Sequence, residues 1–334
     1  MFMSQIVECV ANISEGKDPM IIADIAQAII SDTETTLLHI DSGHDANRTV
    51  YTFTGTLISL RKSVLQMYEM ALHHIDMRSH SGTHPRIGAV DVCPFIPIKG
   101  ITIQELIPWV NELAQEISKR FLIPVYLYEK SAIKEYRQNL ATIRKGEYEN
   151  LSKKFNNELW QADFGANTDW LKSGATVIGA RQFLLAYNIN LKTRDVLIAK
   201  KIAKQIRGSG YINPGGRRVP GLFPSVKAIG WYIDEYRCAQ VSTNLINYKH
   251  DSFHQVFDAC TQLAQESNTI VTGSELIGLT PLEPLRMAGL HYGDIDMDES
   301  ELVATACINL GLSDFNEFNP KERVIEYLLE NIMA

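Results

Sequence analysis

The densest run of chemically active side chains in this sequence is HSGTHPR, from His80 to Arg86. Its two histidines stand four residues apart, a spacing that gathers metal ligands on one face only within a helix. Gly82 and Pro85 disfavour a helix here, so a zinc site is not expected. The alternatives are an exposed turn or a histidine that exchanges protons near neutral pH. We take His84 as the candidate acid–base, helped by the neighbouring arginine and the carboxylate of Asp91.

Two further loops carry polar side chains. The turn IDSGHDANRTV has five polar side chains at the ends of two strands, namely Asp41, His44, Asp45, Asn47 and Arg48. A solvated turn is its default explanation. The basic segment RGSGYINPGGRRVPG, which overlaps the loop Gly208–Pro224, superficially resembles a phosphate cradle, but it follows an expected helix rather than a strand. A dinucleotide site is therefore not expected there, and a cationic flap and a plain surface excursion both stay open.

The composition of the chain limits the class of protein. Its 334 residues are 45% hydrophobic and 21% charged, as expected for a globular chain with two packed domains. Lysine and arginine number 32 against 39 acidic residues, so the net charge is 32 − 39 = −7. A general nucleic-acid binder needs a basic face, so nucleic acid is not an expected partner. An anionic ligand would need a local cluster of basic side chains.

The amino-terminal sequence and the cysteines indicate an intracellular protein. MFMSQIVECV has no basic segment followed by an apolar run, so it is not expected to be a secretory signal. No window has the roughly 18 uninterrupted apolar residues of a membrane helix. The five cysteines are scattered and never spaced as CxxC, which favours reduced thiols over disulfides or a zinc ribbon. We expect a cytoplasmic protein that does not bind membranes.

The hydrophobic patterning predicts two similar halves, residues 1–175 and 176–334. In the first half the order is βαββαβαβ, with strands Gln5–Ile13, Thr35–Asp41, Asn47–Thr56, Gly88–Ile98 and Pro124–Tyr128 and helices Met20–Ile30, Leu60–Ile75 and Ile103–Arg120. In the second the order is βαββαβ, with strands Phe183–Leu191, Ala228–Ile233, Ala239–Tyr248 and Ile270–Ile277 and helices Asp195–Arg207 and Asp251–Ser267. A helical tail, Glu301–Met333, should follow.

The repeated element order predicts the fold class. Helices laid on one face of an antiparallel sheet in each half indicate an α+β protein of two ferredoxin-like subdomains, rather than a doubly wound parallel sheet. The intervening segment Arg137–Ala175 is polar and aperiodic. Long irregular segments inside compact proteins are usually functional or disordered. Because Phe164 and Trp170 are embedded in it, we interpret it as a binding loop plus a connector.

Long motifs in one order make the chain resemble the formiminotransferase family, the glutamate formimidoyltransferase of histidine breakdown. They cover almost the whole sequence and are ECVANISEG, DANRTVYTFTG, GTHPRIGAVDVCPFIPIKG, PVYLYE, IRKGEYE, DFGANTDWLKSGATVIGARQFLLAYNINL, KAIGWYIDE, AQVSTNL and NPKERVIEYL. The resemblance is to the single-function form, without a cyclodeaminase domain. Ala11, His44 and Asp45 depart from the family pattern, and Gly208–Pro224 is longer and more basic.

The resemblance implies a reaction, a fold and a site. The formimino group would pass from N-formimino-L-glutamate to N5 of tetrahydrofolate, giving 5-formimidoyltetrahydrofolate and L-glutamate, with the site between two ferredoxin-like subdomains. It implies no metal and suggests a homodimer. The catalytic positions would be His84, Asp41 and Arg48. The folate-binding loop would comprise Gly165, Ala166, Asn167, Thr168, Asp169, Trp170, Leu171, Lys172, Ser173 and Gly174.

These residue types suit a mechanism. His84 would take the proton from folate N5 and return it to the leaving amine, while Asp41 orients or charges the imidazole. Because both substrates carry carboxylates, arginines must hold them, and the candidates are Arg48, Arg86 and Arg181. A weaker hypothesis assigns Arg217 and Arg218 to the polyglutamate tail of natural folates.

Three alternatives remain open at this point. A glutamate formyltransferase, working with N-formyl-L-glutamate or 5-formyltetrahydrofolate, would use the same residues, because the groups differ only by =O for =NH. A non-catalytic folate-binding protein would bind without releasing glutamate. A metal hydrolase would gather its ligands from His80, His84, Asp91 and Cys93.

Overall fold

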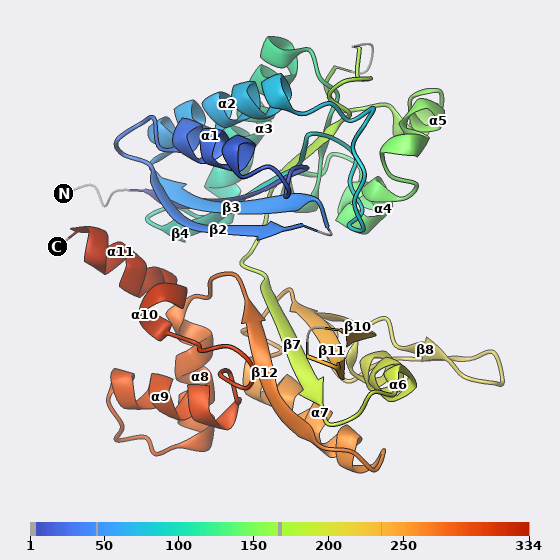
Figure 1. The fold of residues 1–334 in the computed structure, drawn as a ribbon, viewed down its shortest axis with the longest axis vertical. Helices are drawn as coiled ribbons and strands as arrows, with labels where there is room; N and C mark the ends of the chain where they lie inside the picture. The colour runs from blue at the N-terminus through green and yellow to red at the C-terminus, as the bar shows by residue number, and fades with distance from the viewer. Residues whose placement is uncertain (1–4, 45, 166–168, 235, 334) are drawn as a thin grey trace. The chain divides into compact units, whose positions relative to one another are not determined.

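The computed structural model describes residues 5–44, 46–165, 169–234 and 236–333 (Figure 1). The chain divides into two compact units, Met1–Gln182 and Phe183–Ala334. The division lies seven residues beyond the expected boundary at 175 (182 − 175 = 7), because β6 (Thr176–Ala180) pairs with strands of the first unit. Within the described residues, no helix is long and apolar enough to cross a membrane.

The first unit is built on a six-stranded sheet of order β2-β3-β1-β4-β6-β5. Its antiparallel part consists of β2 (Thr36–Gly43), β3 (Arg48–Gly55), β1 (Ile6–Ile13) and β4 (Val90–Lys99). β6 pairs in parallel with β4 and with β5 (Val125–Leu127). The expectation of a purely antiparallel sheet is therefore wrong for this unit. Parallel pairing joins segments distant in sequence, and no local pattern reveals it.

Three helices cover one face of this sheet: α1 (Pro19–Ile29), α2 (Leu57–His74) and α3 (Ile103–Phe121). Each begins at a side chain that accepts a hydrogen bond from a free backbone N–H, namely Asp18, Thr56 and Thr102. Alternate residues of the strands fill the core between sheet and helices, including Val7, Cys9, Ala11, Ile13, Tyr51 and Phe53, all with no exposed surface. The intervening residues therefore face the other side of the sheet.

The second unit contains a four-stranded antiparallel sheet of order β10-β11-β7-β12. Its strands are β7 (Leu185–Leu191), β10 (Val226–Ile233), β11 (Cys238–Leu245) and β12 (Val271–Ile277), with helices α6 (Val196–Ile206) and α7 (Phe253–Gln265). The succession β7-α6-β10-β11-α7-β12 repeats β1-α1-β2-β3-α2-β4 of the first unit, and the strand orders correspond. Overall the chain is a mixed α+β protein with two main sheets.

The helical carboxyl-terminal region begins earlier than the expected tail, which started at Glu301. It contains α8 (Leu282–Tyr292), α9 (Glu299–Asn309), α10 (Pro320–Arg323) and α11 (Ile325–Met333). Helix α9 ends before Gly311, which has a positive φ of 60°. Helix α8 was not expected, because prolines at 281 and 284 and Gly289 are typical of a loop. The basic segment after α6 forms a small hairpin, β8 (Tyr211–Ile212) with β9 (Arg218–Val219).

The connector between β5 and β6 is structured, although its sequence is aperiodic. It contains the short helices α4 (Leu140–Arg144) and α5 (Leu151–Phe155), whose apolar residues Ile143 and Leu151 pack with Tyr126 and Tyr128 in a separate small core. The fully buried Arg137 pairs with Asp163 at 2.8 Å. This core fixes the connector against the edge of the sheet, so its polar residues have definite positions.

Candidate active site

His84 lies in the loop between α2 and β4, residues 75–89. Backbone hydrogen bonds join this loop to the carboxyl-terminal end of the expected folate loop. Met77 N donates to Lys172 O at 2.9 Å and Ala89 N to Ser173 O at 2.8 Å. A Cβ at Gly88 would lie 2.1 Å from the carbonyl oxygen of Ala175, so the approach requires glycine. Two segments singled out separately in the sequence are thus adjacent.

The imidazole of His84 contacts one guanidinium and one carbonyl. Nε2 lies 2.7 Å from Arg48 Nη1, and Nδ1 lies 2.8 Å from Pro85 O. A guanidinium only donates hydrogen bonds and a carbonyl only accepts them. The network therefore assigns the proton to Nδ1 and leaves the Nε2 lone pair facing Arg48. His84 is a neutral imidazole held in one tautomer.

The surroundings of His84 keep it neutral. Burial of the half-buried ring, followed by the charges of Arg48 and Arg144, lowers its pKa from 6.5 to about 3. The hydrogen bond to Pro85 O acts in the opposite direction. At neutral pH the ring is therefore uncharged, and its one unprotonated nitrogen is Nε2, which faces Arg48.

Arg48 reaches His84 from the first position of β3. It pairs across the hairpin with Gly43, and Asp41 pairs with Val50, so Asp41 and Arg48 are diagonal neighbours on the face away from the helices. The pKa of Arg48 is lowered, first by burial and then by Arg144, while Asp91 and Asp41 raise it. The expected contact between Asp41 and the imidazole is not among the described hydrogen bonds of His84, whose two nitrogens face Arg48 and Pro85.

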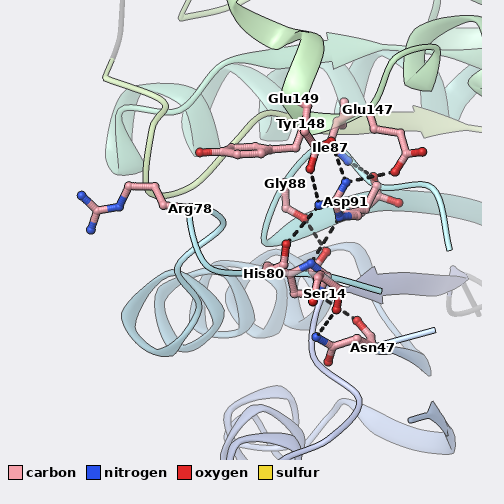
Figure 2. A network of polar contacts seen from close by, with 12 residues as sticks. Ser14, Asn47, Arg78, His80, Ile87, Gly88, Asp91, Glu147, Tyr148 and Glu149 are labelled. Carbon is pink, nitrogen blue, oxygen red and sulfur yellow. Dashed lines mark hydrogen bonds and ion pairs between the residues drawn. The ribbon is translucent and has the colours of Figure 1, made fainter. Parts of the chain in front are cut away.

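Arg86 has a different role from the one expected. Its nearly buried guanidinium donates to Glu149 at 2.6 and 2.9 Å and to Glu147 at 3.0 Å. Figure 2 labels both glutamates. It also donates to His80 Nδ1 at 3.2 Å. These bonds pair Arg86 with the protein's own groups, and none of the bonds described reaches His84.

His80 and Asn47 connect this network to the hairpin that carries Arg48. His80 Nε2 lies 3.0 Å from Asn47 O, and Asn47 Nδ2 donates to Ser81 O at 2.8 Å (Figure 2). Asn47 Oδ1 accepts from Gly16 N at 3.1 Å. The loop of His84 and the turn before Arg48 are therefore fastened to each other through Asn47, next to the Arg48–His84 contact.

Asp91 is also engaged away from the imidazole. This fully buried carboxylate accepts from Ile87 N at 2.8 Å and forms an ion pair with Arg144 of α4. The sequence analysis did not single out Arg144, Glu147 or Glu149. Their only signal was membership of the motif IRKGEYE, because their partners lie some fifty to sixty positions away along the chain.

Comparison with known proteins decides the family. The model of the formiminotransferase domain, N-terminal subdomain, matches residues 6–181, and that of the formiminotransferase domain matches residues 186–330. The chain belongs to the formiminotransferase family. These boundaries fall close to the division between its two units.

Relatives in this family have two kinds of name. "Formimidoyltransferase-cyclodeaminase" of Dictyostelium discoideum is 42% identical over 333 residues, 98% of this chain and 61% of that protein. "Glutamate formimidoyltransferase" of Streptococcus pyogenes serotype M1 is 39% identical over 88% of this chain and 95% of that protein. The Thermoplasma acidophilum protein of the same name is 32% identical over 96% and 97%. The chain thus spans about three fifths of the cyclodeaminase relatives.

The expected folate-binding loop of this formiminotransferase chain is described in part. Gly165 and Asp169 to Gly174 are placed, whereas Ala166, Asn167 and Thr168 lie outside the described residues, as does Asp45. Trp170 packs against Tyr148 and Phe155, and Lys172 Nζ donates to His73 O at 3.1 Å. Trp170 and Lys172 thus anchor the loop to the connector and to α2.

The remaining candidates lie elsewhere. Arg181 follows β6 and donates to Gln182 O at 2.9 Å. Arg217 and Arg218 are exposed on the β8–β9 segment of the second unit. The Cys93 thiol is buried 3.5 Å from that of Cys9. Within the described part of the chain, no three His, Cys, Asp or Glu side chains are grouped as metal ligands, so His80, His84, Asp91 and Cys93 are not assembled into a metal centre there.

Proposed function

We propose that this protein transfers the formimino group from N-formimino-L-glutamate to N5 of tetrahydrofolate, giving 5-formimidoyltetrahydrofolate and L-glutamate. The observation that carries the proposal is the neutral imidazole of His84, held by Pro85 and facing Arg48, within a chain of the formiminotransferase family. Tetrahydrofolate is a co-substrate here, and the proposed chemistry uses no metal.

The proposed reaction needs one proton acceptor that later becomes a proton donor. As N5 attacks the amidine carbon, its proton passes to His84 Nε2. The imidazolium then protonates the glutamate nitrogen as the old carbon–nitrogen bond breaks, which regenerates the neutral ring. Such general acid–base catalysis contributes roughly 10²–10⁴-fold to a rate.

The donor also needs a cation for its carboxylates, and Arg48 is suited to the task. No described carboxylate lies within ion-pair distance of its guanidinium, although Asp41 and Asp91 raise its pKa from farther away. Arg144, the second nearby cation, is paired with Asp91. A carboxylate bound to Arg48 would gain a charge-assisted, bidentate hydrogen bond. Arg48 is thus a local positive charge of the kind that an anionic substrate requires in a protein that is acidic overall.

The proposal extends to the architecture and setting of the protein. The matching element orders support two duplicated ferredoxin-like subdomains, with β5, β6 and the connector added to the first. We further propose a cytoplasmic homodimer. Light scattering of the purified protein tests the dimer, and fractionation of its source cells tests the location.

Glutamate release tests the function directly. Purified protein is incubated with N-formimino-L-glutamate or N-formyl-L-glutamate, each with and without tetrahydrofolate, and with a chelator in a parallel set. We expect release only with the formimino donor and tetrahydrofolate together, unchanged by the chelator. Faster release from the formyl donor would establish the formyltransferase alternative. Folate binding without release from either donor would establish a binding protein, and loss of release on chelation would implicate a metal.

A further inference from the structure

Arg48 occupies the one atom of His84 that the proposed reaction requires to be free. The proton on Nδ1 is directed to Pro85 O at 2.8 Å, so Nε2 is the only basic nitrogen of the ring. Its lone pair accepts a hydrogen bond from Arg48 Nη1 at 2.7 Å. A nitrogen whose lone pair already accepts a hydrogen bond from a guanidinium cannot take the N5 proton in the same geometry. The described arrangement is therefore a resting state of the base.

We propose that Arg48 is a substrate-operated cap on His84, which a carboxylate of the glutamyl donor draws off Nε2, so that the base becomes active only when the donor is bound. The assignment of His84 as the base rests on the proposed function. The cap itself rests on the contacts of the two side chains and goes beyond the transfer reaction.

The charges around Arg48 favour its capture by an anion. Its guanidinium is half-buried, and the nearby cation Arg144 lowers its pKa. The Asp91 carboxylate is committed to Arg144 and to Ile87 N, and the Asp41 carboxylate, on the same sheet face, is exposed to solvent. A bidentate bond to a carboxylate is stronger than a bond to a neutral imidazole. A donor carboxylate therefore offers Arg48 a better partner than Nε2.

The imidazole is held more firmly than the arginine. Pro85 O fixes Nδ1, and the His80–Asn47 and Arg86–Glu149 bonds hold the loop on either side of His84. Arg48 has a long side chain, and its only described hydrogen-bond partner through that side chain is His84. Arg48 is thus the side chain that moves, while the ring keeps its orientation and tautomer.

Movement of Arg48 away from Nε2 changes the basicity of His84 as well as the access of the N5 proton to Nε2. Arg48 and Arg144 are the charged groups that lower the pKa of the ring, after burial, and the carboxylates near them are Asp91 and Asp41. A donor carboxylate adds a negative charge beside the first of these cations. The positive charge on the imidazolium that forms when N5 gives up its proton is then less strongly destabilised by the two arginines. When the glutamate nitrogen has taken that proton and glutamate leaves, Arg48 returns to Nε2.

Nuclear magnetic resonance of the full chain with ¹⁵N-labelled histidine tests the cap without any turnover. His84 signals are assigned by their loss in His84→Gln, and the pKa and tautomer are followed by pH titration in wild type and Arg48→Gln. The ligand probe is L-glutamate, and L-glutaminamide, which has the same skeleton without carboxylates, is its matched control. Arg48→Lys, which keeps the charge, serves as a second variant.

The cap predicts a low pKa for His84 in the free wild type, with protonated Nδ1 and unprotonated Nε2. Arg48→Gln should raise its proton affinity by about tenfold or more, one pKa unit. L-glutamate should raise it in wild type but not in Arg48→Gln, and L-glutaminamide should have no effect. An equal pKa in wild type and both variants, or no response to L-glutamate up to its solubility limit, would overturn the cap. Failure of glutamate release alone would overturn the proposed function and leave this result standing.

Discussion

The two units build the same hairpin turn but equip it differently. In the first, Asn47 with a φ of 47° precedes β3, and in the second, Arg237 with a φ of 51° precedes β11. The next residue, the first of its strand, is Arg48 in one unit and the buried Cys238 in the other. The fold therefore forms this turn in both units, whereas only the first unit has an arginine at the strand position that follows it.

The connection from the second helix to the last strand differs even more. Between α2 and β4 it comprises residues 75–89 and carries His84, whereas between α7 and β12 it is the short turn 266–270. On the helix-free face of the second sheet, Trp231, Gln240 and Asn190 instead form a row of hydrogen bonds at 2.7 Å. The proposed acid–base chemistry therefore depends on one enlarged loop and one arginine, not on the repeated framework.

Removing the imidazole should have the largest effect. His84→Gln should lower kcat by roughly 10²–10⁴-fold, because the proposed proton transfers depend on its imidazole, while folate binding persists. The rate of glutamate release and the affinity for tetrahydrofolate are the measurements. His291→Gln, in an exposed pair with Asp258 of the second unit, is the matched control and should leave kcat unchanged. A wild-type rate in His84→Gln would contradict the proposal that the His84 loop of the first unit carries the chemistry.

Exchanging the residues at the corresponding turn positions sharpens the comparison. Arg48→Cys should lower kcat/KM for the formimino donor by about 10- to 100-fold, the equivalent of a hydrogen bond to a charged group, mainly through KM. Cys238→Arg should not restore the loss when combined with it, since the second unit has no equivalent of the His84 loop. Steady-state kinetics on the three variants decides this. A change in kcat alone, with KM intact, would contradict a carboxylate-binding role for Arg48.

The network that fastens the loop should contribute to stability. Arg86→Met removes the bonds to Glu147, Glu149 and His80 and should cost about 2 kcal/mol of unfolding free energy. Arg120→Met breaks the exposed pair with Glu69, in which both side chains are about half exposed, and should cost less than about 1 kcal/mol. Urea unfolding measures both. Equal costs would show that the Arg86 network does not fasten the loop.

The pH dependence of stability gives the smallest expected effect. The pKa of His84 is about 3 in the folded chain and 6.5 without burial, so the unfolded chain binds more protons between these values. Neutral His84 therefore contributes stability that is complete above pH 6.5 and lost as pH falls toward 3, about 1–2 kcal/mol after allowance for solvent screening. His84→Gln should lack this dependence. Urea titrations at pH 7 and pH 4 measure the free energy of unfolding of both proteins. A difference in that free energy between wild type and His84→Gln that is the same at both pH values would contradict the prediction.

Much of the framework could be predicted from the sequence, because it is encoded locally. Alternation of apolar and polar residues marks the strands β1 and β3, and the capping residues Asp18 and Thr102 mark the starts of two helices. Each of these signals lies within a few residues of the element that it marks. β6 is the counterexample. Its five residues are all buried and carry no alternation, so only the parallel pairing with β4 and β5 shows that it belongs to the first unit.

The sequence singled out candidate residues for the site but could not show their partners. His84 and Arg48 stand in distinctive polar runs, and their family resemblance supported their selection. The pairing of His84 with Arg48 joins residues 36 positions apart, and that of Arg86 with Glu149 joins residues 63 apart. The sequence therefore could not separate Arg86 from Arg48 among the candidates for binding a substrate carboxylate, because nothing local indicates which guanidinium a distant glutamate pairs with.

Transfer of a labelled carbon tests the central claim most directly. N-formimino-L-glutamate with ¹³C in the formimino group is incubated with tetrahydrofolate and the protein, and the fate of the label is followed by nuclear magnetic resonance. We predict that the label becomes bonded to N5 of the folate while free glutamate appears in equal amount, and that His84→Gln abolishes both within the same period. Label that remains on glutamate, or that is released to solvent as a small one-carbon product, would contradict the account.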